Sequence, residues 1–171
     1  IIIPYFTDNG LIGISGRINY NNMSYKIPKY MAMVNYKKTR SLYGLYENYK
    51  NLVSNRIYVF EAEKSVMIAD SMGIYNTVAV GHCGISRTQK NILLSLNPSE
   101  VIVCFDEGIS EQTILDICRI FKTRSNLLKC KVGYIYDGDN KYLRKYEKES
   151  PIENKYWEEL IKNNIKYLSE E

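Results

Sequence analysis

The chain of 171 residues has a single histidine, His82, and no apolar run that approaches the roughly 20 residues a transmembrane helix needs. A lone histidine leaves no basis for a Ser-His or Cys-His catalytic pair, so a helix-entry or packing role is expected for His82. The four cysteines include no C-x-x-C pair, which argues against a zinc ribbon. There is also no internal repeat, low-complexity tract or long linker. The length and the 45% apolar content allow one core, or one core with a smaller appended subdomain.

The cysteines and the first residues carry two further expectations. Each cysteine lies in or beside an apolar segment, which predicts buried, reduced thiols in a cytoplasmic protein. They are Cys83, Cys104, Cys118 and Cys130. The opening Ile1-Ile-Ile-Pro4 has no initiator Met or basic flank, so it does not fit a signal peptide and suggests a piece of a longer protein.

The net charge of +4 is unevenly distributed. Residues 1–56 carry eight basic and two acidic side chains, whereas the remaining 115 residues carry 15 basic and 17 acidic ones. A cationic surface beside an anionic part suits an enzyme that acts on nucleic acid. Tyrosines that could stack bases of a single strand lie among these basic residues, although an AT-rich genome would also produce such a Tyr- and Lys-rich composition. They are Tyr20, Tyr25, Tyr30 and Tyr36.

The apolar pattern predicts an α/β protein in which strands and helices alternate. The first 50 residues hold two short strands, 1–6 and 11–18, around the Asn-Gly turn of residues 7–10. A helix is expected over 42–52. Further strands are expected at 57–60, 77–80, 101–105 and 132–136, and further helices at about 63–72, 86–95, 110–122 and 153–168. Regular alternation of this kind favours a mostly parallel sheet covered by helices.

Three of the expected strands end in carboxylates. The run Ile57-Tyr-Val-Phe-Glu-Ala-Glu-Lys64 places Glu61 at a strand tip, the next such run leads to Asp106 and Glu107, and the third leads to Asp137 and Asp139. Because parallel strands share one carboxyl edge, these acids can meet there. Mg²⁺ prefers such oxygen ligands, usually one or two carboxylates with waters and substrate phosphates. The sequence therefore predicts a site for Mg²⁺ or Mn²⁺.

Three of these acids allow two interpretations each. Glu107 is either a second ligand or a surface acid that opens the next helix, where carboxylates are favoured. Asp137 and Asp139 flank Gly138, which fits a ligand loop and equally an ordinary turn.

Five segments in order resemble the catalytic core of bacterial-type (DnaG-type) DNA primases. Residues 2–17, I-I-P-Y-F-T-D-N-G-L-I-G-I-S-G-R, resemble F-P-I-x-D-x-x-G-x-x-x-G-F-G-G-R, and 28–30 resemble the start of P-K-Y-L-N-S. Residues 38–45 resemble K-G-x-x-L-Y-G-L, and 61–73 resemble the E-G-x-x-D…A-G opening of the TOPRIM domain. Residues 78–89 resemble V-A-x-x-G-T-A-L-T-x-x-Q. Each motif alone is weak, but their order and spacing are specific.

The chain departs from the family pattern at three acidic motifs. Asp106-Glu-Gly108 stands where the family has D-x-D, and Ser65 replaces the Asp four residues after Glu61. Asp137-Gly-Asp139 precedes Tyr142-Leu where the family has D-P-D before Y-L. Glu61, Asp106 and Asp137 or Asp139 remain as acids, and the variant pattern suggests a phage-borne or mobile-element primase.

The resemblance implies a TOPRIM fold at 53–140, preceded by a basic mixed α+β subdomain at 1–52 and followed by a helical segment at 141–171. It implies that Glu61 and Asp106 are catalytic, Glu61 as a metal ligand or as the acid/base at the 3′-hydroxyl. Arg17, Lys29, Tyr30 and Lys38 match positions expected to hold the single-stranded DNA template and the RNA primer. The motif at 42–45 is expected to join the two parts.

The implied activity is metal-dependent nucleotidyl transfer from NTPs, which makes short RNA primers on single-stranded DNA. A replicative helicase would bind through regions outside this chain. Two other functions remain open: a degenerate TOPRIM module that binds single-stranded DNA or a replication partner without catalysis, and a TOPRIM nuclease.

Overall fold

The computed structural model describes residues 1–19, 28–34, 36–121, 130–138 and 150–169, and its strands form two sheets. The smaller sheet has the order β1-β2-β3 and is antiparallel. Its strands are β1 (Ile2–Thr7), β2 (Gly10–Arg17) and β3 (Tyr30–Val34). The turn between β1 and β2 contains Asp8 and Asn9 and is followed by Gly10 at φ 101°, which confirms the expected hairpin.

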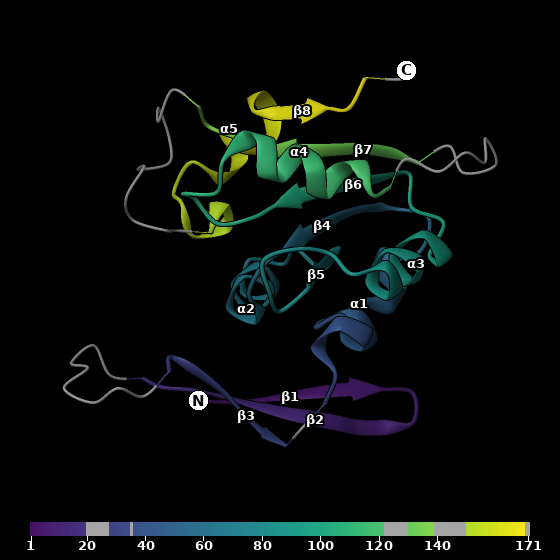
Figure 1. The fold of residues 1–171 in the computed structure, drawn as a ribbon, viewed down its shortest axis with the longest axis vertical. Coiled ribbons are helices and arrows are strands. Elements are labelled where there is room, and N and C mark those ends of the chain that lie inside the picture. The colour runs from purple at the N-terminus through teal and green to yellow at the C-terminus, as the bar shows by residue number, and fades with distance from the viewer. Residues whose placement is uncertain (20–27, 35, 122–129, 139–149, 170–171) are drawn as a thin grey trace.

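The larger sheet has the order β5-β4-β6-β7-β8, and its first four strands are parallel. They are β4 (Arg56–Phe60), β5 (Thr77–Ala79), β6 (Glu100–Cys104) and β7 (Lys131–Ile135). β8 (Ile165–Tyr167) pairs with β7 in the antiparallel direction. Figure 1 shows the smaller sheet at one end of the molecule and β8 at the other.

Helices cover both faces of the larger sheet because its strand residues alternate between two apolar clusters. On one face, Val59 and Val103 pack with α1 (Leu45–Leu52), α3 (Arg87–Ser95) and α4 (Glu111–Arg119). On the other face, Phe60 and Ile102 pack with α2 (Glu63–Ser71), α5 (Trp157–Asn163) and the 3-10 turn η2 (Pro151–Glu153). The α/β class with a mostly parallel sheet is therefore confirmed.

Two segments connect the sheets. The 3-10 turn η1 (Lys38–Arg40) follows β3, and Tyr43 then forms a bridge with Ala79 of β5 through N–H···O bonds of 2.9 and 3.0 Å. The motif at 42–45 thus pairs with β5 through Tyr43, and α1 begins only at its last residue. No helix among the residues described above is long and apolar enough to cross a membrane.

The structure corrects three expectations. The helix expected at about 153–168 is wrong, because that stretch divides into η2, α5 and β8. β3 and β8 were not expected as strands. Cys83 is exposed, although Cys104 and Cys118 are buried and all four cysteines are free as predicted.

Candidate metal and nucleotide site

Three acids follow neighbouring parallel strands at the same edge of the larger sheet. Glu61 follows β4, Asp106 lies two residues beyond β6, and Asp137 lies two residues beyond β7. Val103 of β6 pairs with Tyr134 of β7, so the same register continued by three residues places Asp106 opposite Asp137. The expected convergence of strand ends is therefore present in the backbone.

The Asp106 carboxyl group is partly buried close to another negative charge. Its Oδ1 atom is buried and has no hydrogen-bond partner within the described structure. Burial, and then the negative charge of Glu61, raise the pKa of Asp106 to about 6, against the opposing effects of Lys29 and Lys64. A buried carboxylate oxygen without a donor is a position that a cation would satisfy.

Glu61 lies close to Asp106 and to the loop after β5. Burial raises the pKa of Glu61, and the neighbouring His82 opposes that rise. Burial, Glu61 and Asp106 also raise the pKa of the Cys83 thiol, so both carboxylates act on the same loop. Two carboxylates that lie near each other, one with an unsatisfied oxygen, fit a hard divalent cation, which commonly takes only one or two protein carboxylates.

The remaining acids are placed less simply. Glu107 is half-buried and lies three residues before Ser110, the residue that caps α4, so Glu107 does not open that helix. Asp137 is only 8% exposed, and Asp139 lies outside the described residues. Across the described part of the chain, no group of three or more His, Cys, Asp or Glu side chains is arranged to hold a metal.

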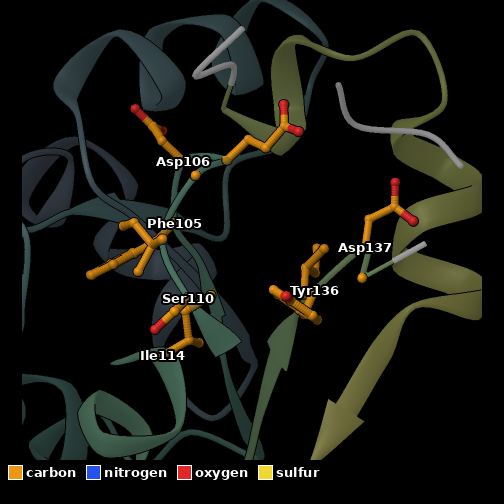
Figure 2. Close-up of a pocket in the computed structure, with 11 residues that line it drawn as sticks. Phe105, Asp106, Ser110, Ile114, Tyr136 and Asp137 are labelled. Atoms are coloured by element: carbon orange, nitrogen blue, oxygen red, sulfur yellow. The ribbon is translucent and has the colours of Figure 1, made fainter. Parts of the chain in front are cut away.

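A cavity of about 330 Å³ lies between the ends of β6 and β7. Its lining comes from residues 105–110, Ile114 and residues 135–138, so it combines acids with apolar and aromatic walls. Figure 2 shows Asp106 and Asp137 on opposite sides of this pocket, with carboxylates that do not point at each other. The pocket thus separates Asp137 from the Glu61 and Asp106 pair.

The expected nucleic-acid-binding residues lie on and beside the smaller sheet. Arg17, the last residue of β2, lies over the ring of Tyr30 with Cζ 5.6 Å from its centroid. Lys29 is exposed and lowers the pKa of Asp106, so its charge acts on the carboxyl edge of the larger sheet. Lys38 differs from the others because its Nζ donates to Glu63 Oε1 at 2.8 Å.

Two site-forming residues were missed by the sequence analysis. Glu63 is buried, and it accepts hydrogen bonds from Lys38 and from the Tyr5 hydroxyl. Gln89 is fully buried, and its Nε2 donates to the carbonyl oxygens of Lys38, Ser41 and Val80. Gln89 is the last residue of the motif matched at 78–89, and Ser86-x-x-Gln89 also has the spacing of a capping box, which the structure shows to be formed at α3.

A three-stranded antiparallel unit ahead of a parallel sheet with acidic strand ends is the architecture of the DnaG-type primase catalytic core with its TOPRIM domain. A DNA primase domain from Pseudomonas aeruginosa matches with a TM-score of 0.73 and 20% identity over 97% of this chain and 51% of that one. The structure of the Aquifex aeolicus primase contains its zinc-binding and RNA polymerase domains. It matches with a TM-score of 0.71 and 23% identity over 98% of this chain and 40% of that one. The E. coli primase catalytic core matches with a TM-score of 0.69 and 22% identity over 98% of this chain and 52% of that one. The resemblance to this fold is thus confirmed.

One curated protein is related in sequence. The SPbeta prophage-derived uncharacterized protein YorJ of Bacillus subtilis (strain 168) is 34% identical over 120 residues, which cover 63% of this chain and 31% of YorJ. No family model matches the chain. The chain spans about a third of this relative and about half of the primase cores. A prophage-encoded relative is consistent with the expected phage origin.

Proposed function

We propose that this chain is part of the catalytic core of a DNA primase, a nucleotidyltransferase that uses NTPs to make short RNA primers on single-stranded DNA. The observation that carries the proposal is the pair formed by Glu61 and Asp106 at adjacent strand ends, with the unsatisfied Oδ1 of Asp106. The primase-core fold over nearly the whole chain supports it.

Glu61 and Asp106 would hold Mg²⁺ or Mn²⁺ in this proposal, and waters and substrate phosphates would complete the coordination. Such a cation orients the triphosphate and stabilises the charge on the leaving pyrophosphate. Asp137 lines the adjoining pocket and Glu107 lies at its rim, from where either could bind a second ion or its water shell. Asp139, expected in the same role, lies outside the described residues.

Arg17, Lys29, Tyr30 and Lys38 would hold the template and the growing primer. The Lys29 charge acts on the acidic edge, and the Tyr30 ring lies under Arg17, so a base and a phosphate could be held side by side. A DnaG primase catalytic domain bound to single-stranded DNA matches with a TM-score of 0.63 and 24% identity over 80% of this chain, which supports DNA binding. A helicase partner would bind through other parts of the protein.

A second candidate is a binding module without catalysis. It is favoured by Asp106-Glu-Gly108, which lacks the second acid of the family motif, and by the absence of a three-ligand metal group from the described residues. Such a module would still bind single-stranded DNA through the basic residues.

Two measurements separate the candidates. In a crystal soaked with Mn²⁺, anomalous density within about 2.0–2.3 Å of the Glu61 and Asp106 carboxylates is expected for the enzyme. In the full-length protein, primer synthesis on single-stranded DNA should require Mg²⁺ or Mn²⁺ and should be lost on Glu61→Gln, which keeps shape and removes charge. Glu158→Gln, a change of an exposed acid on α5, is the matched control. Full-length protein that makes no primer with either metal would favour the binding module.

A further inference from the structure

A buried ionic cluster links the smaller sheet to the edge of the larger sheet beside Glu61. Its centre is Glu63, the first residue of α2, whose side chain is 3% exposed. Glu63 Oε1 accepts hydrogen bonds from Lys38 Nζ of η1 and from the hydroxyl of Tyr5 on β1. Burial and the Glu63 charge hold the pKa of Tyr5 far above its usual value, so Tyr5 remains a donor. The carboxylate therefore has two fixed donors from separate segments.

The cluster lies against Gly81, directly after β5. The Gly81 N–H donates to the carbonyl oxygen of Glu61 at 2.8 Å, so this glycine is tied to the residue proposed to bind metal. A Cβ placed on Gly81 would lie 3.1 Å from Lys38 Cδ and 3.6 Å from Glu63 Oε1. Gly81 also has φ 76°, where a side chain is strained. The Lys38 side chain thus passes over the backbone at the carboxyl edge.

The two charges of this ion pair differ in access. The Lys38 side chain is 28% exposed, whereas that of Glu63 is 3% exposed, so an outside ligand could reach the lysine side chain more easily than the carboxylate. An ammonium group has three donors, and the hydrogen bond to Glu63 uses one. Lys38 could therefore bind a phosphate oxygen while it keeps Glu63 as a partner.

We propose that Glu63 is a positioning residue, which holds the Lys38 side chain over Gly81, next to the Glu61 backbone, so that its ammonium group meets a phosphate of the nucleotide at this edge. The inference rests on the proposed nucleotidyl transfer. A lysine that is already ordered loses less side-chain entropy when it binds phosphate. A neutral residue at position 63 would keep Lys38 in the chain but would no longer hold its ammonium group in one position.

A double-mutant cycle tests whether Glu63 acts through Lys38. In full-length protein, Glu63→Gln should lower kcat/KM for metal-dependent primer extension at least tenfold, since Gln can still accept from Tyr5 and loses the charge that fixes Lys38. Glu100→Gln, which breaks the ion pair with Arg56 at the opposite end of β4 and β6, should change it less than twofold. When Lys38 is already replaced by Met, adding Glu63→Gln should lower kcat/KM by less than a further twofold. Full additivity of the two changes, or full activity of Glu63→Gln, would overturn the proposal.

A footprint separates this inference from the proposed function. The rate of Lys38 acylation by an amine-reactive reagent, read by mass spectrometry, should fall at least fivefold when ATP and Mn²⁺ are added to wild type, and less than twofold in Glu63→Gln. Exposed Lys37 is the internal control. If Lys38 is protected only in wild type and no primer is made, the proposed primase activity is wrong and the positioning role of Glu63 stands. If primer is made and Lys38 is protected equally in both proteins, the positioning role is wrong and the primase activity stands. Should Glu63→Gln fail to fold, an unprotected Lys38 in wild type would still overturn the proposal.

Discussion

The Asp106 carboxyl group makes the protein less stable when it ionises. Its pKa is raised from 3.8 to about 6, chiefly by burial and then by Glu61. The folded state thus binds more protons than the unfolded state between these values, so stability falls as pH rises from about 4 to about 6. The full shift corresponds to about 3 kcal/mol, which partial exposure reduces to about 1 kcal/mol.

In metal-free buffer, Asp106→Asn is therefore expected to be more stable than wild type at pH 7.5 by about 1 kcal/mol, measured by urea unfolding. The difference should grow from pH 4 to pH 6.5 and stay level above that. Asp116→Asn, at an exposed acid on α4, should show no such growth. A difference of equal size at every pH would mean that ionisation of Asp106 is not its cause.

Lys38 has a structural role that its basic character alone does not reveal. Removing one partner of a buried ion pair leaves the other charge uncompensated, which costs about 3–5 kcal/mol when both are buried. Because Lys38 is partly exposed, Lys38→Ala should lower the free energy of unfolding by about 2 kcal/mol. Lys37→Ala, its exposed neighbour, should change it by less than about 0.5 kcal/mol. Equal stability of the two variants would show that water compensates Glu63, and any loss of DNA binding in Lys38→Ala must be corrected for unfolded protein.

At the scale of elements, Gln89 joins α3 to η1 and β5. Its buried side chain closes the capping box with Ser86 and donates to three carbonyl oxygens, those of Lys38, Ser41 and Val80. Gln89→Ala should therefore lower the free energy of unfolding by about 2–4 kcal/mol, since several buried polar groups lose their partner. Gln112→Ala at an exposed position of α4, where the side chain bonds the exposed Asp116, should cost less than about 0.5 kcal/mol. Thermal unfolding of both variants gives the comparison.

The strands and helices of the larger sheet could be predicted because local pattern and tertiary burial agree there. β4 and β6 were expected within one residue of their observed bounds, since almost all their residues are buried and apolar or β-branched. The helix expected at the end of the chain was wrong because Trp157, Leu160 and Ile161 set a helical spacing that stops at Asn163. The next residues complete the sheet by pairing with β7. Such pairing depends on a strand more than 30 residues earlier, which local periodicity does not record.

β3 was missed for a related reason. Its five residues alternate poorly between polar and apolar, and four of them are exposed, so no buried face marks it as a strand. It forms because β2 supplies hydrogen-bond partners, with Arg17 opposite Tyr30 and Gly16 opposite Met31. A strand defined by its neighbour and not by burial is the case in which pattern analysis is weakest.

At the scale of the whole molecule, the sequence could predict which acids gather at one edge but not their side-chain geometry. The parallel order of β4, β6 and β7 determines the convergence of Glu61, Asp106 and Asp137, and alternation of strands and helices was enough to predict it. The pocket that separates Asp137 from Asp106 arises from the turn that leads into α4. The ion pair of Lys38 with Glu63 arises from the approach of the two sheets. Neither can be read from spacing along the chain.

The uneven charge of the sequence is partly reflected in space, since Lys29 of the basic first third acts on Asp106 at the acidic edge, whereas Arg56 lies at the opposite end of β4. Lys29 is exposed and influences Asp106, whereas Lys131 is exposed at the opposite end of β7.

If single-stranded DNA binds across the acidic edge, Lys29→Ala should weaken binding of an oligothymidylate and Lys131→Ala should not. Each phosphate contact contributes about −0.7 to the slope of log affinity against log salt for a single strand, so Lys29→Ala should flatten that slope by about 0.7. Fluorescence anisotropy between 50 and 200 mM salt, roughly the range in which such contacts weaken most, measures both quantities. If Lys131→Ala flattened the slope as much as Lys29→Ala, DNA binding would depend on the net charge of the protein and not on the acidic edge of the larger sheet.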